Sequence, residues 1–347
     1  MAEKTQPKVV LIRNERQAVT SYDVARHAGV SQSAVSRCFK PGASVSAKMR
    51  ERVMAAAAEL GYEPNAIARS LITRRSNLVA ILISNLTNLY YPEVLAELTE
   101  RFSAHGVRVL LFSLKSEADA NETLRQIWPY RVDGVIAASE LSPDQIAEFE
   151  KRRVPLVFYN RHLNGSAVSS VCCDQEDGAR QLVDGLYNAG HRRFAILAGP
   201  PGSLVGVERK TAAIERLEEL GVDDAPVLEG NYSYESGFAL IGELMARDGE
   251  RPDAVICAND VMAIGALDAL RVNFDLSAPE DISVVGFDGV GPASWKQYDL
   301  TTIRQPVRRM TEATVSMLLS MIEDPDALVE RRVFSGILKN GSSAKFE

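Results

Sequence analysis

Short, continuous apolar runs recur along most of the chain and are separated by segments with helical character. The first run, at 78–83, is followed by a helix-like segment at 91–105 and a second run at 107–112. Unbroken apolar runs are typical of strands buried on both faces, and helical crossovers between them indicate parallel strands. The pattern predicts an α/β fold. Further strands are expected at 132–137, 154–159, 194–198, 254–258 and 282–287, and further helices at 175–189, 208–220, 236–248 and 261–274.

The charge of the chain is divided unevenly. Residues 1–76 carry 13 Lys and Arg against 6 Asp and Glu, whereas the remaining residues carry 26 against 40. A basic segment joined to an acidic body is typical of a nucleic-acid-binding domain attached to a second domain. The N-terminal extension, 1–18, has too short an apolar run for a signal peptide, and no later run approaches the ~18 residues of a membrane span. We therefore expect a cytoplasmic protein that does not associate with membranes.

The basic segment contains two short helix-like stretches joined by a tight turn. Thr20 can cap the first helix, Gly29 tolerates the left-handed conformation that ends it, and Ser31 can cap the second. A third helix is predicted from Ser46 to Leu60 and would close a three-helix core. Two helices joined this tightly predict a helix-turn-helix motif.

The second helix offers a polar outer face if Ala34, Val35 and Cys38 point inward. Glutamine and arginine can bind adenine and guanine edges in a bidentate manner, and serine can reach phosphates or bases. Ordinary exposed helices carry the same residue types, so the helix alone leaves both interpretations open. The outward residues are Gln32, Ser33, Ser36 and Arg37.

A shorter helix-permissive segment, Asn65–Leu71, follows Pro64. It is about two turns long, and isolated helices below roughly 12 to 15 residues are marginal in water. Leu71 suits insertion into a minor-groove base step, where Arg69, beside the small Ala68, can meet the negative potential of the groove. The alternative is a flexible linker whose Leu71 packs on the body.

Together these stretches resemble the lactose and galactose repressor family of bacterial transcription regulators. The matching residues are 19–31, 34–37, 45–46, 59–62 and 64–71. The resemblance implies that Gln32 and Ser33 are variable specificity positions, that Arg37 reads a base or anchors the backbone, and that Leu71 is the wedge of a hinge helix. It implies homodimers whose two heads read a near-palindromic double-stranded operator. The other DNA-binding residues it implies are Thr20, Tyr22, Ser31, Ser36, Asn65, Ala68 and Arg69.

The body resembles the effector core of the same family, which is similar to periplasmic sugar-binding proteins. This resemblance implies two doubly wound parallel-sheet subdomains with a ligand between them and crossovers near 171–174, 302–305 and 333–336. The predicted domains are a helix-turn-helix head at 19–63, a hinge helix and linker at 64–76, and a core at 77–347, in which subdomain 1 covers about 77–172 and 305–334 and subdomain 2 about 173–304 and 335–347.

Polar and aromatic residues follow several predicted strands, where ligands bind in parallel sheets. Amides, carboxylates and tyrosine rings suit sugar hydroxyls and ring faces, although Asn85 can equally cap a helix. Asn160 stands where the family often has Asp, and Val207 stands where some sugar-responsive members carry Arg, so no particular sugar is implied. The effector contacts that we expect are Asn85, Tyr90, Tyr91, Asn160, Arg161, Ser203, Tyr232, Asn259, Asp288 and Trp295.

Signatures of catalysis, metal binding and cofactor binding are missing from the sequence. It has no phosphate loop, zinc-binding helix pair or nucleophile elbow, and its four cysteines include no C-x-x-C pair. We expect a ligand-controlled transcription regulator, most simply a repressor, that is not an enzyme and uses no cofactor. Two alternatives are a solute-binding protein, which would need an export signal and no basic head, and a regulator that requires its ligand as a corepressor.

Overall fold

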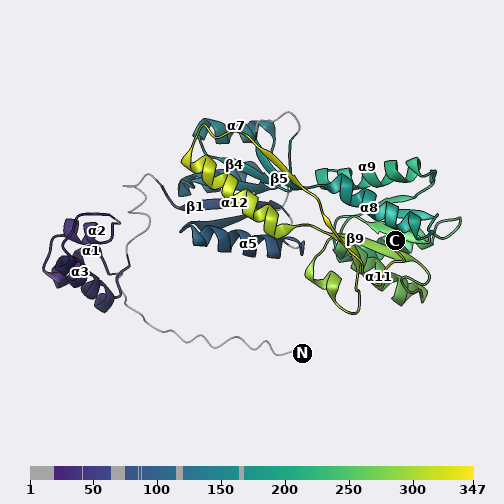
Figure 1. The fold of residues 1–347 in the computed structure, drawn as a ribbon, viewed down its shortest axis with the longest axis horizontal. Coiled ribbons are helices and arrows are strands. Elements are labelled where there is room, and N and C mark those ends of the chain that lie inside the picture. Colours follow the sequence, from purple (N-terminus) through teal and green to yellow (C-terminus); the bar gives the residue numbers. More distant parts are fainter. Residues whose placement is uncertain are drawn as a thin grey trace, which may run out of the picture. The chain divides into compact units, whose positions relative to one another are not determined.

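The computed structural model of the protein describes residues 19–40, 42–63, 75–84, 86, 88–114, 120–163 and 168–347. The chain divides into two compact units, Met1–Ser76 and Asn77–Glu347, which we call the head and the core (Figure 1). Of the helices in the described ranges, none is both long and apolar enough to cross a membrane.

The described residues of the head form three helices, α1 (Ser21–Ala28), α2 (Gln32–Cys38) and α3 (Ala47–Leu60). Val24, Val35 and Val53, one from each helix, are completely buried and form the centre of its hydrophobic core. The three helices predicted between Thr20 and Leu60 are therefore confirmed, because the residues at helical spacing face one another as the sequence pattern required.

The first part of the core, which we call the first lobe, is built on a six-stranded sheet in which neighbouring strands are all parallel. Its helices are α5 (Tyr91–Ala104), α6 (Ala120–Ile127), α7 (Pro143–Arg152) and α12 (Val307–Glu323). In spatial order the strands are β11 (Arg331–Phe334), β5 (Ser169–Cys173), β4 (Leu156–Tyr159), β3 (Gly134–Ala138), β1 (Leu78–Ser84) and β2 (Arg108–Leu114).

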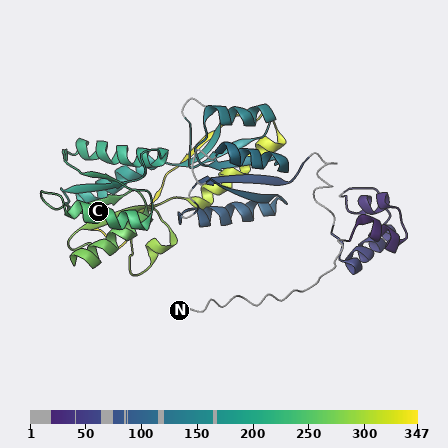
Figure 2. The same ribbon diagram turned by 180° about the vertical axis from the view of Figure 1, so that it is seen from behind.

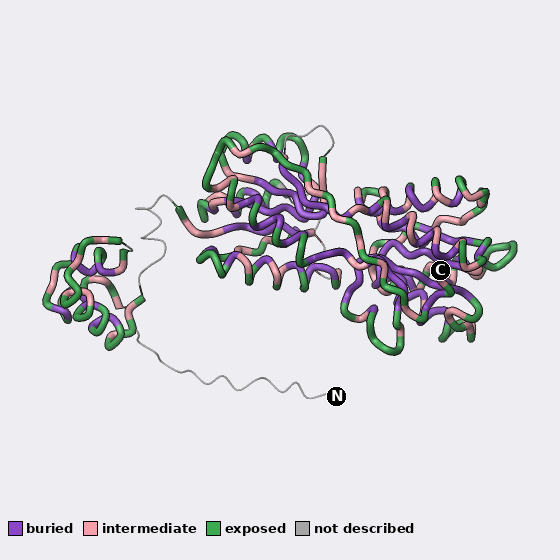
Figure 3. Tube along the Cα trace, in the orientation of Figure 1, coloured by how far each residue is buried: buried purple, intermediate pink, exposed green. Residues whose placement is uncertain are grey.

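Helices cover both faces of this sheet. Ile81 and Ile83 of β1 pack in one cluster with α5 and α12, whereas Leu82, between them, packs in another with α6 and α7. Successive strand residues point to opposite faces, so an unbroken apolar run is the pattern that a doubly covered strand requires. Figure 3 shows the strands as the buried centre of each lobe.

The second lobe repeats this plan with α8 (Gln175–Asn188), α9 (Leu204–Glu219), α10 (Tyr234–Met245) and α11 (Asp260–Phe274). Its six strands are parallel except for an antiparallel edge strand, β12. In spatial order they are β12 (Ile337–Lys339), β10 (Thr301–Arg304), β9 (Ser283–Asp288), β8 (Ala254–Cys257), β6 (Phe194–Ala198) and β7 (Val227–Glu229).

The chain passes between the lobes three times: between β5 and α8, between β10 and α12, and between β11 and β12. The same two lobes are seen from both sides in Figures 1 and 2. The predicted α/β class with two parallel-sheet subdomains is confirmed. The helix predicted from Glu208 begins earlier, at Leu204, because Ser203 caps it by accepting a hydrogen bond from the N–H of Gly206.

Candidate functional sites in the head and core

The turn between α1 and α2 is fixed by caps on both sides. Thr20 caps α1, and its hydroxyl donates to the Asp23 carboxylate over 2.6 Å, which lowers the pKa of that carboxyl. Gly29 ends α1 in the left-handed region with φ +61°, and Ser31 caps α2 by accepting a hydrogen bond from the N–H of Ala34. The local sequence therefore determines the direction in which α2 leaves the turn.

The outer face of α2 is polar, as predicted. Ser33, Ser36 and Arg37 are exposed, while Gln32 is half-buried and its amide nitrogen donates to the Ser21 hydroxyl over 3.2 Å. Tyr22 of the neighbouring helix is 68% exposed. These side chains form one hydrogen-bonding surface of the kind that reads base edges and phosphates. Four predicted DNA-binding residues, Asn65, Ala68, Arg69 and Leu71, lie outside the described residues.

Another basic residue of the head has a structural role. Arg50 of α3 donates from Nη1 to the carbonyl oxygen of Cys38 over 2.6 Å and from Nη2 to that of Ala43 over 3.4 Å. It thereby holds the segment that follows α2 against α3.

In the core, a cavity of about 360 Å³ lies between the lobes, where the strands of both sheets end. This is the position expected for ligands in open parallel sheets. Seven of the ten predicted effector residues line it, namely Tyr90, Tyr91, Asn160, Arg161, Ser203, Tyr232 and Asp288.

The other three predicted effector residues do not line the described cavity. Asn85 lies outside the described residues. Asn259 is fully buried, caps α11 through its Oδ1, and donates from its amide nitrogen to the carbonyl of Tyr232 over 3.2 Å, so it supports the cavity wall. Trp295 is 59% exposed and follows the short 3-10 helix Gly291–Ser294, outside the cavity.

Three lining residues have a backbone conformation that L-amino acids rarely adopt. Asn160, Tyr232 and Asp288 have φ angles of +52°, +67° and +112°. Such conformations cost free energy and persist where surrounding contacts hold them, often at ligand-binding sites. Their occurrence at the ends of β4, β7 and β9 is independent support for a functional cavity.

Arg209, a residue that the sequence did not suggest, lies at the centre of the polar wall. Its guanidinium donates to Asp288 Oδ1 over 2.9 Å, to Gln175 Oε1 over 2.8 Å and to the carbonyl of Ala258 over 2.6 Å. It also lies 3.7 Å above the ring of Phe287. Since all these contacts come from the protein, Arg209 holds Asp288 in place as much as it faces a ligand.

Gln305 is a second lining residue that the sequence reading missed. Its amide nitrogen donates to Asp288 Oδ1 over 2.8 Å, and its Oε1 is buried without a hydrogen-bond partner among the described residues. A buried acceptor without a partner carries a desolvation cost that a donor on a ligand, such as a hydroxyl, would remove.

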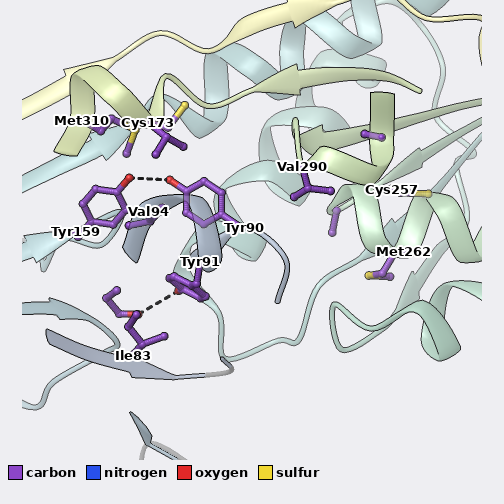
Figure 4. Packing of buried hydrophobic residues seen from close by; sticks show 14 of the residues in the cluster. Ile83, Tyr90, Tyr91, Val94, Tyr159, Cys173, Cys257, Met262, Val290 and Met310 are labelled. Carbon is purple, nitrogen blue, oxygen red and sulfur yellow. Dashed lines mark hydrogen bonds between the residues drawn. The ribbon is translucent and has the colours of Figure 1, made fainter. Parts of the chain in front are cut away.

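Aromatic rings form the apolar wall. Tyr90 and Tyr159 are buried with their hydroxyls 3.1 Å apart, and the Tyr91 hydroxyl donates to the carbonyl of Ala138 over 3.2 Å (Figure 4). Burial raises the pKa of Tyr90 well above its ordinary value, so the hydroxyl stays protonated. The hydroxyls of these side chains are thus hydrogen-bonded within the protein. Tyr90 and Tyr91 therefore offer a ligand chiefly the surface of their rings.

Hydrogen bonds beside the cavity are among those that join the lobes. Asn160 Oδ1, in the first lobe, accepts from the amide nitrogen of Gln175 over 2.9 Å, and Gln175 in turn accepts from Arg209. Glu140, also in the first lobe, accepts from the N–H of Leu204 at the start of α9 over 3.1 Å. The first path continues from Arg209 to Asp288 and so joins the polar wall of the second lobe to Asn160 of the first, whereas the bond of Glu140 is separate from it.

The chain was compared with known proteins. Residues 20–65 match the sequence model described as bacterial regulatory proteins, lacI family, and residues 183–344 match that of a periplasmic binding protein-like domain. The regulator CelR of Thermobifida fusca is 33% identical over 309 residues, which cover 86% of this chain and 90% of CelR.

The chain belongs to the lacI family. Two solved structures of the family share its fold. The Lac repressor dimer bound to operator and the anti-inducer ONPF matches with a TM-score of 0.85 and 30% identity, covering 94% of this chain and 99% of that one. A CelR–cellobiose complex matches with a TM-score of 0.71 and 31% identity, covering 94% and 100%.

Membership of the lacI family explains why one chain holds both candidate sites. It is a DNA-binding transcriptional regulator with a domain for an effector, and the relatives it matches are regulators rather than enzymes. In the described part of the chain, no cluster of His, Cys, Asp and Glu side chains could hold a metal ion. Burial raises the pKa of Cys172 to about 11 and that of Cys173 to about 12, so both thiols stay protonated.

Proposed function

We propose that this lacI-family regulator is a homodimeric repressor whose affinity for operator DNA is lowered by a carbohydrate or carbohydrate derivative bound between the lobes. The observation that carries the proposal is the combination, in one chain, of an exposed reading face on α2 with a cavity lined by tyrosines, amides and hydroxyls. The operator complex of the Lac repressor dimer and the cellobiose complex of CelR support the two halves of the proposal.

We propose that residues 65–71, which lie outside the described residues, couple the two sites. On sequence grounds they form a short hinge helix that is marginal alone, so a small rotation of the lobes on effector binding would separate two such helices and weaken DNA binding. Allosteric couplings of ~1–3 kcal/mol change affinity about 5- to 150-fold, which is sufficient for control of a gene. Because the protein must reach chromosomal DNA, we place it in the cytoplasm. We also propose that it has no enzymatic activity.

A corepressor mechanism is the main alternative. It uses the same two sites, but the effector would then strengthen DNA binding. The sign of the change in operator affinity when effector is added separates the two mechanisms directly. A solute-binding protein without a role in transcription would show no sequence preference for DNA at all.

Selection of binding sites from random double-stranded DNA with the full chain tests DNA recognition. We expect a near-palindromic consensus and a binding constant that falls steeply with salt, since each neutralised phosphate contributes about −0.9 to the slope of log K against log salt. A flat salt response, or the recovery of no consensus, would refute the assignment.

Single substitutions then test the reading residues. Gln32→Ala should change the consensus at one position per half-site, whereas Gln181→Ala in the core should leave the consensus unchanged. Leu71→Ala should weaken binding to the selected operator much more than binding to unrelated DNA. Equal losses on both DNAs would argue against a minor-groove wedge.

A further inference from the structure

Of the two arginines that line the cavity, Arg209 is paired with Asp288, whereas Arg161 forms no ion pair in the described part of the chain. Its guanidinium has five N–H donors, and the hydrogen bond that it makes runs from Nη1 to the carbonyl oxygen of Asn160 over 2.7 Å. Among the described residues no carboxylate lies within 4.0 Å of it to form an ion pair, although the Glu140 carboxylate is near enough to help raise the pKa of Arg161. Most of its donors are therefore available to a molecule in the cavity.

The other charged groups that line the cavity are already engaged. Arg209 and Asp288 neutralise each other, with Gln305 as a further donor to Asp288. Glu140 accepts from the N–H of Leu204 at the positive end of α9. The cationic partner of an anionic group on a ligand would therefore be Arg161. The N-terminus of α9 would add little binding energy, because the N–H of Leu204 already donates to Glu140.

The backbone of Arg161 is held in a fixed place. The thiol of Cys172, in β5, donates to the Arg161 carbonyl oxygen over 3.2 Å, and Asn160 before it accepts from the N–H of Cys173 over 3.2 Å. Both bonds tie the loop after β4 to the neighbouring strand. The hydrogen bond from Nη1 to the Asn160 carbonyl restrains the guanidinium itself, and its planar fork matches carboxylate and phosphate oxygens.

We infer that the effector is an acidic sugar, whose carboxylate or phosphate pairs with Arg161 while its hydroxyls meet the amides and the free acceptor of Gln305. This inference rests on the proposed function of the cavity and specifies its ligand class. Charge-assisted hydrogen bonds are stronger than bonds between neutral groups, so the acid should bind more tightly than the matching neutral sugar.

Isothermal titration of the full chain with matched sugars tests the inference. The probes are D-glucose and D-galactose, their uronates, D-gluconate and D-glucose 6-phosphate. We expect at least one acid to bind roughly 10- to 100-fold more tightly than its neutral counterpart, and the phosphate and carboxylate arms show which anion fits. Tighter binding of the neutral sugars would overturn the inference and leave the proposed function intact. Binding of none of the probes would count against the carbohydrate effector itself.

Substitutions of the arginine test its role. Arg161→Gln should remove the preference for the acid, and Arg161→Lys, which keeps the charge but loses the fork, should retain part of it. Arg247→Gln makes the same charge change at an exposed position after α10 and should leave the preference unchanged. Should Arg161→Gln bind the acid as tightly as the unmodified chain does, the assignment to Arg161 would be wrong. Circular dichroism spectra of all three variants establish that they are folded.

Discussion

Arg209 Nη2 donates a hydrogen bond to Asp288 Oδ1 over 2.9 Å, although 79 residues separate the two in the chain. The side chains are only 7% and 5% exposed. Removing one member of a buried ion pair leaves the other charge uncompensated, at a cost of about 3–5 kcal/mol. We expect Arg209→Met to lower the free energy of unfolding of the full chain by that amount in urea denaturation. The double variant with Asp288→Asn should lose less than the two single variants together, whereas strictly additive losses would show that the pair is not coupled.

The stability of the core should depend on pH through Asp260. This carboxyl is completely buried. It accepts hydrogen bonds from the Thr302 hydroxyl over 2.5 Å and from the N–H of Val290 over 2.7 Å. Burial, and then the nearby Asp288 carboxylate, raise its pKa from 3.8 to about 8. Between these values the folded chain keeps a proton that the unfolded chain has released.

It follows that the free energy of unfolding decreases as pH rises from about 4 to about 8, by up to ~1.4 kcal/mol per pH unit from this group. Asp260→Asn removes the titration and preserves the shape of the side chain. In urea denaturation at several pH values, the variant should therefore gain stability relative to the unmodified chain as pH rises. Parallel pH profiles of the two proteins would contradict the prediction.

Gly206 leaves room for Tyr232 in the cavity wall. A Cβ on Gly206 would lie 2.5 Å from the Tyr232 hydroxyl oxygen, which makes a 2.8 Å hydrogen bond with Ser203. We expect Gly206→Ala to displace that ring and to weaken effector binding roughly tenfold in titration calorimetry, the equivalent of losing about one hydrogen bond. Gly242→Ala is the control, because a Cβ there meets nothing within 4 Å and the residue is not part of the cavity lining. Equal affinities of the two variants would argue against Tyr232 as a wall of the binding site.

Two glycines in the second lobe should respond in opposite directions to the same substitution. A Cβ on Gly265 of α11 would overlap the carbonyl oxygen of Tyr234 of α10, so the helices pack closely only without a side chain there. Gly265→Ala should destabilise the core by about 1–3 kcal/mol through overpacking. Gly242→Ala, within α10 and with open space around it, should stabilise by up to about 1 kcal/mol. Melting temperatures that shift in the same direction would contradict this reading.

Seven of the twelve described strands were predicted from the sequence because they carry a strong, local signal, whereas β5, β7, β10, β11 and β12 were not. Runs such as Leu78–Ile83 are apolar without interruption, the usual pattern of a doubly covered strand, whereas the buried strands β5 and β10 begin with polar residues. Among the helices of the first lobe, α6, α12 and α7 (Pro143–Arg152) were not predicted, and in α7 most residues are polar and few of them are buried. Its position depends on packing against the sheet rather than on its composition.

The lining residues that directly follow a strand were predicted from the sequence. Those whose burial depends on contacts with distant parts of the chain were missed. Arg209 stands between Glu208 and Lys210, a context that reads as a solvated helix face, and its burial depends on Asp288 and Gln175. The spacing of Val205, Arg209 and Ala212, all buried on α9, was the available signal. Trp295 shows the opposite case. It was expected to contact the effector because it is an aromatic residue near a strand end, yet it is exposed and lies outside the cavity.

Both sheets receive their edge strand from the same short stretch near residue 335. β11 pairs with β5 in the first lobe and β12 pairs with β10 in the second, and only Ser335 and Gly336 separate them in the chain. During synthesis, every other strand of both sheets emerges from the ribosome before these two. Each sheet therefore lacks one of its edge strands until this stretch has been synthesised, so neither lobe can be completed before the ribosome has passed it.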